Sequence, residues 1–366
     1  MKLTGGQIVA KALKANGVDY VAGMPGDGSW ALLEALLAPG TDIPFIQVMQ
    51  GHSAVHLADG YFRACGRPMA VVLTGPTGIA KALGALAVAR EDASALLLIS
   101  DARVEAAAAD PKEQALVSVI EQLPQALRQA FDTMLSERVG PVSLAIDVAV
   151  QHASIDARLP PAILRAEPQA IRRKIAVLRE GRGSRSVLEG DALLVVGDRR
   201  IQAMVREMFH LHYPGRHLSA GNPETLGWAV PAAIGAKLAM PARQVVCAVG
   251  SGDFLQSMQE MAVCMMHSIP VVFLVFNSSG DGGVSDGQAL PMAPHRAGEF
   301  NLPDGKPYSP DFAGIARNFG LEAWRVEYAS QLNPTLIKAL NSKGPSLVDV
   351  MAARQGHEAA LQAPQS

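Results

Sequence analysis

The chain has 366 residues, of which 49% are hydrophobic and 18% are charged, and its formal net charge is −2. The length predicts two domains, and the composition is typical of well-buried α/β proteins. The small net charge gives no electrostatic reason to bind nucleic acid or an acidic membrane surface, so neither partner is expected.

No apolar run approaches the roughly 18 residues that a helix needs to cross a bilayer. The N-terminal segment has the pattern of an amphipathic helix rather than of a signal peptide. The cysteines are odd in number, and two of them, Cys247 and Cys264, lie in apolar runs. We expect reduced core thiols, not bridges or metal ligands. The sequence therefore predicts a soluble, cytoplasmic protein.

In the first half of the chain, predicted strands alternate with predicted helices. A helix over residues 4–17 has Ile8, Val9 and Leu13 on one face, and Gly17 ends it. Further helices are expected over residues 31–37 and around 56–61, and strands over residues 20–23, 44–48, 69–73, 95–99 and 143–146. This alternation predicts a doubly wound parallel sheet within residues 1–150.

Residues 151–190 interrupt the alternation, and we interpret them as a linker that carries one helix, because they contain Pro160-Pro161 and a basic run. A second domain follows over residues 191–352. Its expected strands are residues 192–196, 245–249, 269–276, 322–326 and 346–350. Residues 353–366 are expected to be a frayed tail. The predicted fold class is thus α/β, with two doubly wound parallel-sheet domains.

The stretch Val245–Gly283 is the most informative part of the second domain. It contains a buried strand, a glycine turn over residues 250–253, a helix that ends in Met265 and Met266, a second buried strand and a polar, glycine-rich turn. We interpret the two methionines as core filling. Since parallel strands end at the same edge of a sheet, both turns are expected at the ligand-binding edge. The stretch has no GxGxxG continuation, which argues against a dinucleotide site.

Several motifs in this order resemble thiamine-diphosphate enzymes of the acetolactate synthase type. VDYVAGMPGDGSWALLEAL, HLADGYFRACGRP and TGPTG are similar to the N-terminal pyrimidine-binding domain of that family. The stretch that resembles the diphosphate-binding domain of the same family is LSAGNPETLGWAVPAAIGAKLAMPARQVVCAVGSGDF. The middle domain of acetolactate synthases is absent, and the two-domain layout resembles phosphonopyruvate and sulfopyruvate decarboxylases. The resemblance implies a small-molecule ligand at a subunit interface, and hence a homodimer or a larger assembly.

The resemblance also implies where a divalent metal would be held. The family has a Gly-Asp-Gly motif, followed about 27 residues later by the second of two asparagines. Here Gly250 and Gly252 keep the glycines, while Ser251 and Ser278 occupy the two ligand positions with the same separation (278 − 251 = 27). Neutral hydroxyls are poor replacements for a carboxylate at a magnesium site. We therefore expect no metal site, unless a neighbouring carboxylate such as Asp253 replaces the lost one.

The residues that would activate and bend the cofactor are also read from the resemblance. Gly51 occupies the position of the family's activating glutamate, and His52 is the only acid–base group beside it. His52 is therefore our candidate catalytic residue, with a polar helix-start residue as the alternative. Leu226, next to Thr225, matches the bulky residue under the cofactor, and a packing residue at a helix start is the equally expected alternative.

The glycine-rich turn Gly280–Gly287 is either a lid over the ligand or a flexible connection, and Gly280 completes the set of candidate cofactor-binding residues.

Two interpretations follow. In the first, the fold and its pocket are kept but the cofactor is lost, which gives a cofactor-independent enzyme or a non-catalytic homologue. In the second, the chain is an atypical decarboxylase or carboligase of 2-oxo acids, a lyase that still uses thiamine diphosphate with magnesium. The changes at Gly51, Ser251 and Ser278 favour the first.

Overall fold

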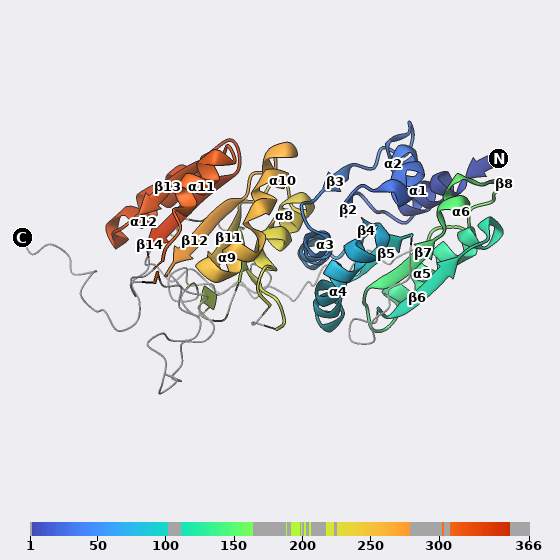
Figure 1. Ribbon diagram of the computed structural model, residues 1–366, viewed down its shortest axis with the longest axis horizontal. Helices are drawn as coiled ribbons and strands as arrows, with labels where there is room; N and C mark the ends of the chain where they lie inside the picture. Colours follow the sequence, from blue (N-terminus) through green and yellow to red (C-terminus); the bar gives the residue numbers. More distant parts are fainter. Residues whose placement is uncertain are drawn as a thin grey trace, which may run out of the picture. The chain divides into compact units, whose positions relative to one another are not determined.

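The structure is a computed structural model, shown in Figure 1. It describes residues 2–101, 111–163, 188, 192–197, 199, 201–202, 205, 217–222, 225–278, 302–303 and 308–351. The predicted linker helix, the turn Gly280–Gly287 and the tail lie outside these residues. The chain divides into two compact units, Met1–Arg182 and Gly183–Ser366.

The first unit is built around a six-stranded parallel sheet with the strand order β3-β2-β4-β5-β7-β6. A separate antiparallel pair joins β1 to β8. The described strands are β1 (Lys2–Thr4), β2 (Val21–Gly23), β3 (Phe45–Gln47), β4 (Met69–Leu73), β5 (Leu96–Ser100), β6 (Glu113–Val117), β7 (Val142–Ile146) and β8 (Ser154–Asp156). The helices are α1 (Gly5–Ala15), α2 (Trp30–Leu37), α3 (Gly51–Cys65), α4 (Gly75–Glu91), α5 (Leu123–Leu135) and α6 (Val148–His152), with 3-10 turns η1 (Asp27–Ser29) and η3 (Ile120–Gln122).

Local signals in the sequence account for where these helices begin and end. Thr4 and Gln7 form a reciprocal capping box at the start of α1, with hydrogen bonds of 3.2 and 3.0 Å between side chain and backbone. Gly66 ends α3 in the left-handed conformation, with φ of 73°. One face of the sheet is covered by apolar residues of α1, α2 and α5 in a continuous core.

The second unit repeats this strand order around a six-stranded parallel sheet, β10-β9-β11-β12-β14-β13. The described strands are β9 (Leu193–Val196), β10 (His217–Leu218), β11 (Val245–Gly250), β12 (Val272–Asn277), β13 (Glu322–Val326) and β14 (Ser346–Met351). The described helices are α8 (Ala229–Ala239), α9 (Ser251–Ser257), α10 (Met261–Met266), α11 (Phe312–Asn318) and α12 (Ala329–Leu340), with the 3-10 turn η4 (Met258–Glu260).

The core of the second unit lies on both faces of its sheet. Leu336 and Ala339 of α12 pack in one cluster with alternate residues of the central strands. On the other face, Phe254 contacts Phe273 and Phe312 with ring centroids 6.3 and 5.3 Å apart. Both sheets are therefore covered by helices, which confirms the predicted doubly wound class.

Three details differ from the sequence-based expectations. Residues 251–253 are the first turn of α9 and not a free turn, because β11 leads directly into the helix at Gly250. The expectation of core filling at Met265 and Met266 was wrong: they are 40% and 52% exposed, because they lie in the last turn of the short helix α10.

Strand β6 and helix α5 were not among the expected elements. None of the helices in the described ranges is both long and apolar enough to cross a membrane.

Candidate functional site

The first candidate site lies at the carboxyl edge of the second sheet. Strand β10 lies on one side of β9, and β11, the next strand in the chain, lies on the other side. The direction in which successive strands are placed therefore reverses between β9 and β11. Open α/β sheets bind their ligands at such a point. Gly250, the last residue of β11, pairs with Phe276 of β12, so Ser251 and Ser278 follow neighbouring strand ends. The register thus places both serines at the predicted edge.

The first turn of α9 buries the residues that follow β11. Ser251 and Asp253 are both 0% exposed, and Gly252 between them is also buried. A buried serine hydroxyl brings two lone pairs but no charge. Ser251 is therefore a neutral, enclosed hydroxyl in the first turn of α9.

Asp253 connects α9 to the loop before α8. Its Oδ1 atom accepts a hydrogen bond of 2.5 Å from the backbone N–H of Gly227, whose φ is +84°. A Cβ atom on Gly197, which follows β9, would lie 1.9 Å from Asp253 Oδ2. Residue 197 must therefore be glycine for this carboxylate to occupy its place. Asp253 is built into the packing of three chain segments.

Thr225 and Leu226 directly precede Gly227, whose backbone N–H bonds to Asp253. Thr225 is half-buried, and the Leu226 side chain is 36% exposed, although it is large and apolar. The chain therefore carries Thr225 and Leu226 close to the first turn of α9, which contains Asp253. Leu226 thus presents apolar surface to the outside of its unit.

At the end of β12, Asn277 is engaged in a buried hydrogen-bond network. Its Nδ2 atom donates to the backbone oxygen of Pro310 at 2.9 Å and to Asp349 Oδ1 at 3.1 Å, and its Oδ1 atom accepts from Ser309 Oγ at 2.7 Å. Burial raises the pKa of Asp349. Ser278, the next residue, is half-buried. The Asn277 amide is thus committed to holding β12, β14 and the segment before α11 together.

In the first unit, the start of α3 contacts the start of α4. A Cβ atom on Gly51 would lie 2.7 Å from the backbone oxygen of Gly78, which is closer than side chains approach backbone. A Cβ atom on Gly78 would meet nothing within 4 Å. The space around residue 51 is therefore closed by the α4 backbone, and a glutamate there would require α4 to move.

Directly after Gly51, α3 carries two histidines, His52 and His56, that lie about one turn apart. The rings of His52 and His56 have centroids 6.2 Å apart in an edge-on arrangement. Burial and, to a lesser degree, the Lys81 charge lower the pKa of His52, so Lys81 of α4 lies within electrostatic reach. His56 is 4% exposed, its Nδ1 atom has no hydrogen-bond partner, and burial lowers its pKa to about 3. Both imidazoles are neutral at pH 7.

The loop after β2 is packed tightly against its neighbours at the carboxyl edge of the first sheet. A Cβ atom on Gly26 would lie 2.1 Å from Thr74 Oγ1, and one on Gly28 would lie 2.2 Å from Asp101 Oδ2. Asp101 Oδ1 accepts a hydrogen bond of 2.8 Å from the Gly75 backbone N–H. These contacts join the ends of β2, β4 and β5 into one close-packed edge.

Comparison with known protein families gives two matches. Residues 3–125 match the N-terminal TPP binding domain of thiamine pyrophosphate enzymes, and residues 200–350 match the C-terminal TPP binding domain. The chain belongs to the thiamine-diphosphate enzyme family. Only residues 126–199 lie between the two matches, and they include most of α5 and the whole of strand β7 of the first unit, so this chain has no middle domain.

Individual relatives match only part of the chain. A probable acetolactate synthase large subunit from Methanococcus aeolicus is 34% identical over 148 residues, which are 39% of this chain and 24% of that protein. An acetolactate synthase from Arthrospira platensis is 36% identical over 141 residues, 38% of this chain and 24% of the relative. The chloroplastic acetolactate synthase 2 of Zea mays is 30% identical over 171 residues, 46% of this chain and 27% of the relative. The matched segments thus span about a quarter of these relatives.

The candidate residues of this thiamine-diphosphate fold do not all lie in one place. Gly250, Ser251, Gly252 and Asp253 lie together at the end of β11, with Ser278 after the neighbouring strand. Thr225 and Leu226 are connected to this group through Gly227, the hydrogen-bond partner of Asp253. His52 belongs to the first unit, and Gly280 lies outside the described residues.

Sequence reasoning missed Gly197, Asn277 and Asp349. The glycine that directly follows the apolar strand β9 was a usable signal for the first of these. Asn277 and Asp349 lie 72 residues apart in the sequence, so no local pattern joins them.

Proposed function

We propose that this chain keeps the fold and pocket of a thiamine-diphosphate enzyme for a small-molecule ligand without using the metal-diphosphate chemistry of that family. It would then be a cofactor-independent enzyme or a non-catalytic homologue, assembled as a homodimer or larger. The observation that carries this proposal is the closed space at Gly51, where a Cβ atom would lie 2.7 Å from the Gly78 backbone oxygen. A merely substituted glutamate would leave its space open.

The second unit supports the same proposal. Magnesium is held in proteins by carboxylates and other strongly polar oxygens in a near-octahedral arrangement. Ser251 offers a buried neutral hydroxyl, and Asp253, the nearby carboxylate, is oriented by the Gly227 N–H and enclosed by Gly197. The described residues at this edge therefore do not fit a metal-bound diphosphate.

His52 is the acid–base group that we assign to the altered site. Its imidazole is half-buried, and burial together with the Lys81 charge lowers its pKa, so it is neutral at pH 7 and able to accept a proton. Neighbouring His56 is enclosed and has a pKa of about 3, which makes it a packing residue and not a second base. His52 is thus the residue to substitute in any search for activity.

One observation favours the second candidate function, an atypical thiamine-diphosphate lyase that decarboxylates or joins 2-oxo acids. Leu226 is 36% exposed at the position of the cofactor-bending residue, and Ser251 and Ser278 keep the family's separation at adjacent strand ends. A shift of α4 away from Gly51 on ligand binding would reconcile this candidate with the crowding there.

Thermal unfolding of the full chain separates the two candidates. A ligand present at 100 times its Kd stabilises the native state by about 2.7 kcal/mol, which raises the Tm by roughly 5 °C. We expect no change of Tm at millimolar thiamine diphosphate with magnesium. A concentration-dependent rise of that size would refute the proposal and establish the second candidate.

Restoring the metal ligands tests the alignment itself. The double variant Ser251→Asp with Ser278→Asn should gain a magnesium-dependent rise of Tm in the presence of thiamine diphosphate. The matched control is Ser251→Asn with Ser278→Asn, which has side chains of the same size but lacks the carboxylate, and it should show no rise. If both double variants behave alike, Ser251 does not occupy the metal-ligand position.

A further inference from the structure

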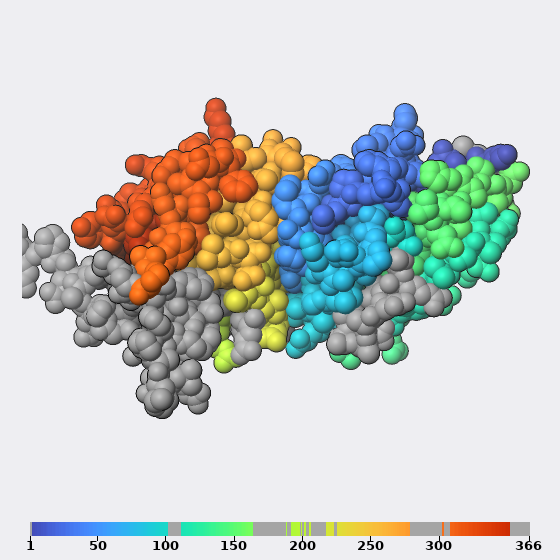
Figure 2. All heavy atoms as spheres, in the orientation of Figure 1, coloured from blue at the N-terminus to red at the C-terminus, as the bar shows by residue number. Residues whose placement is uncertain are grey.

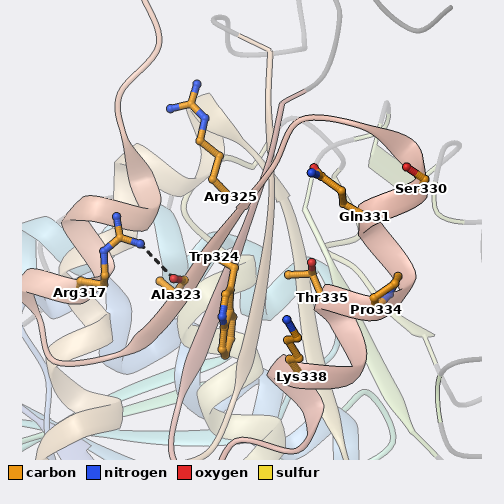
Figure 3. A pocket seen from close by; sticks show the side chains of 9 residues that line it. All are labelled: Arg317, Ala323, Trp324, Arg325, Ser330, Gln331, Pro334, Thr335 and Lys338. Atoms are coloured by element: carbon orange, nitrogen blue, oxygen red, sulfur yellow. Dashed lines mark hydrogen bonds between the residues drawn. The ribbon is translucent and has the colours of Figure 1, made fainter. Parts of the chain in front are cut away.

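A groove runs along the edge strand β13 of the second unit, between this strand and α12. It has a volume of about 540 Å³. Nine described residues line it: Arg317, Ala323, Trp324, Arg325, Ser330, Gln331, Pro334, Thr335 and Lys338 (Figure 3). In Figure 2 the segments of β13 and α12, orange to red, lie at the surface of their unit. In the sheet, β12 and β14 separate β13 from β11, so the groove is distinct from the candidate functional site.

Trp324 gives the groove an aromatic surface. Trp324 packs partly against the core cluster of the second unit, which includes Leu336 and Ala339 of α12, and its remaining surface faces the groove. In Figure 3 the indole lies between β13 and α12, with Thr335 and Lys338 on the helix side. A half-buried indole that is fixed by the core offers a rigid stacking surface for a planar ring.

The walls of the groove are basic. Arg317, Arg325 and Lys338 line it, and none of the nine lining residues is acidic. Arg317 is held beside the strand, because its Nη1 atom donates to the Ala323 backbone oxygen at 3.0 Å. Arg325 is partly neutralised by Glu327, at 3.7 Å, and its side chain points away from Trp324 in Figure 3. Lys338 is therefore the cation best placed to meet an anion that lies against the indole.

The groove also has a definite length. Ser330 and Lys338 are the first and last residues of α12 that line it, and eight helical steps of about 1.5 Å each separate them by roughly 12 Å. Thr335 lies one turn before Lys338 and adds a hydroxyl near the same end. A ligand for this groove is thus a short molecule with a planar ring and an anionic group about half the length of the groove away.

We propose that this groove binds a nucleoside monophosphate. The base stacks on the Trp324 indole, the phosphate accepts hydrogen bonds from Lys338 and Thr335, and the ribose, which links the two, lies between them. An aromatic surface and a cation beside it recognise the two ends of such a molecule, and its size suits the volume. The proposal is independent of whether the chain uses thiamine diphosphate.

Calorimetric titration of the full chain with each of the four ribonucleoside monophosphates tests this proposal. We expect saturable binding of at least one, with the matching nucleoside and inorganic phosphate each binding about 10-fold more weakly, because each contacts only half of the site. Quenching of tryptophan fluorescence should accompany binding and should be lost in Trp324→Phe. Absence of saturable binding for all four at millimolar concentration would overturn the proposal, as would phosphate binding as tightly as the nucleotide.

Two charge variants locate the bound phosphate. Lys338→Gln should weaken nucleotide binding about 10-fold without changing the Tm, because a charged hydrogen bond to phosphate is lost from an exposed side chain. Arg325→Gln should weaken it less, since Glu327 already offsets that charge. The matched control, Lys343→Gln, changes a lysine that does not line the groove and should leave binding unaltered. Equal binding by wild type and Lys338→Gln would place the nucleotide elsewhere and overturn the proposal.

Discussion

The two units have the same strand order, but different kinds of residue occupy the carboxyl edges of their sheets. In the first unit, glycines of the loop after β2 pack against Thr74 and Asp101, and Gly51 packs against the α4 backbone. In the second unit, the edge is organised by a buried carboxylate, Asp253, which reaches the N–H of Gly227 and excludes any side chain at Gly197.

This difference separates what topology decides from what individual side chains decide. The order of the strands places the switch point, and therefore the candidate site, in both units. A few residues, which do not alter the strand order, decide whether that edge can bind an anion or a metal or is filled by close-packed protein groups. Substitutions at these residues therefore test the comparison without changing the fold class.

The largest loss of stability is expected at Gly197, which packs against the buried carboxylate of Asp253. Gly197→Ala places a Cβ atom 1.9 Å from Asp253 Oδ2, and Asp253 cannot move without losing its hydrogen bond to Gly227. We expect a loss of about 3 kcal/mol in the free energy of unfolding, typical of an overpacked buried site. Urea unfolding followed through the fluorescence of buried Trp228 measures this change.

Gly344→Ala is the matched control in the same unit, because a Cβ atom at residue 344 meets nothing within 4 Å. It should change the free energy of unfolding by less than about 1 kcal/mol. If Gly197→Ala were as stable as this control, the close packing of Asp253 against β9 would be disproved.

The next effect concerns the buried histidine of the first unit and depends on pH. His56 has a pKa of about 3 in the folded chain, whereas an unfolded histidine has a pKa near 6.5. Between these values the unfolded state binds the additional proton, so folding stability rises with pH and is lost as the pH falls from about 6.5 toward 3. From pH 7 to pH 5 this amounts to about 2 kcal/mol.

His56→Leu removes the titrating group and also the buried Nδ1 atom that has no partner. The variant should therefore lose about 2 kcal/mol less than wild type between pH 7 and pH 5. Urea unfolding at a series of pH values gives both slopes. Parallel slopes for the two proteins would show that His56 has the same pKa in the folded and the unfolded chain.

Much of this fold could be predicted from the sequence because the central strands are continuous apolar runs. The strands at residues 69–73, 322–326 and 346–351 agree with the expectation to within a residue. The edge strand β6 was missed because four of its five residues are not fully buried and its sequence, EQALV, begins with polar residues. Helix α5 has the helical spacing of Leu127, Ala130, Phe131 and Met134 and was within reach of the same reasoning.

The candidate site was less predictable, because its contacts join distant parts of the chain. The family resemblance supplied the positions of Gly51 and Ser251, but no sequence pattern shows that the Gly78 carbonyl closes the space at residue 51. Similarly, the carboxylate of Asp253 has the chemistry of a metal ligand in the sequence, while its hydrogen bond to Gly227 spans 26 residues. The sequence defines which groups are present, and only the packing shows which of them are already engaged.

A smaller effect is expected at the contact between α3 and α4, which offers a pair of glycines with opposite surroundings. Gly51→Ala places its methyl group 2.7 Å from the Gly78 backbone oxygen and should cost about 1 to 2 kcal/mol of stability. Gly78→Ala adds the same group to open space within α4 and should be neutral or stabilise by up to about 1 kcal/mol. Thermal unfolding of both variants measures the contrast, and a reversed order would show that residue 51 has room for a side chain.

The smallest effect is electrostatic and concerns the candidate acid–base residue. Burial lowers the pKa of His52 first, and the Lys81 charge lowers it further. Lys81→Gln should therefore raise the pKa of His52, measured as the midpoint of its imidazole resonances in an NMR titration. Because Lys81 is exposed, the difference between wild type and variant should shrink in 1 M salt, where the Debye length is about 3 Å. The control Lys14→Gln, on the separate helix α1, should leave the midpoint unchanged. If Lys81→Gln has the same midpoint as wild type, burial alone keeps His52 neutral at pH 7.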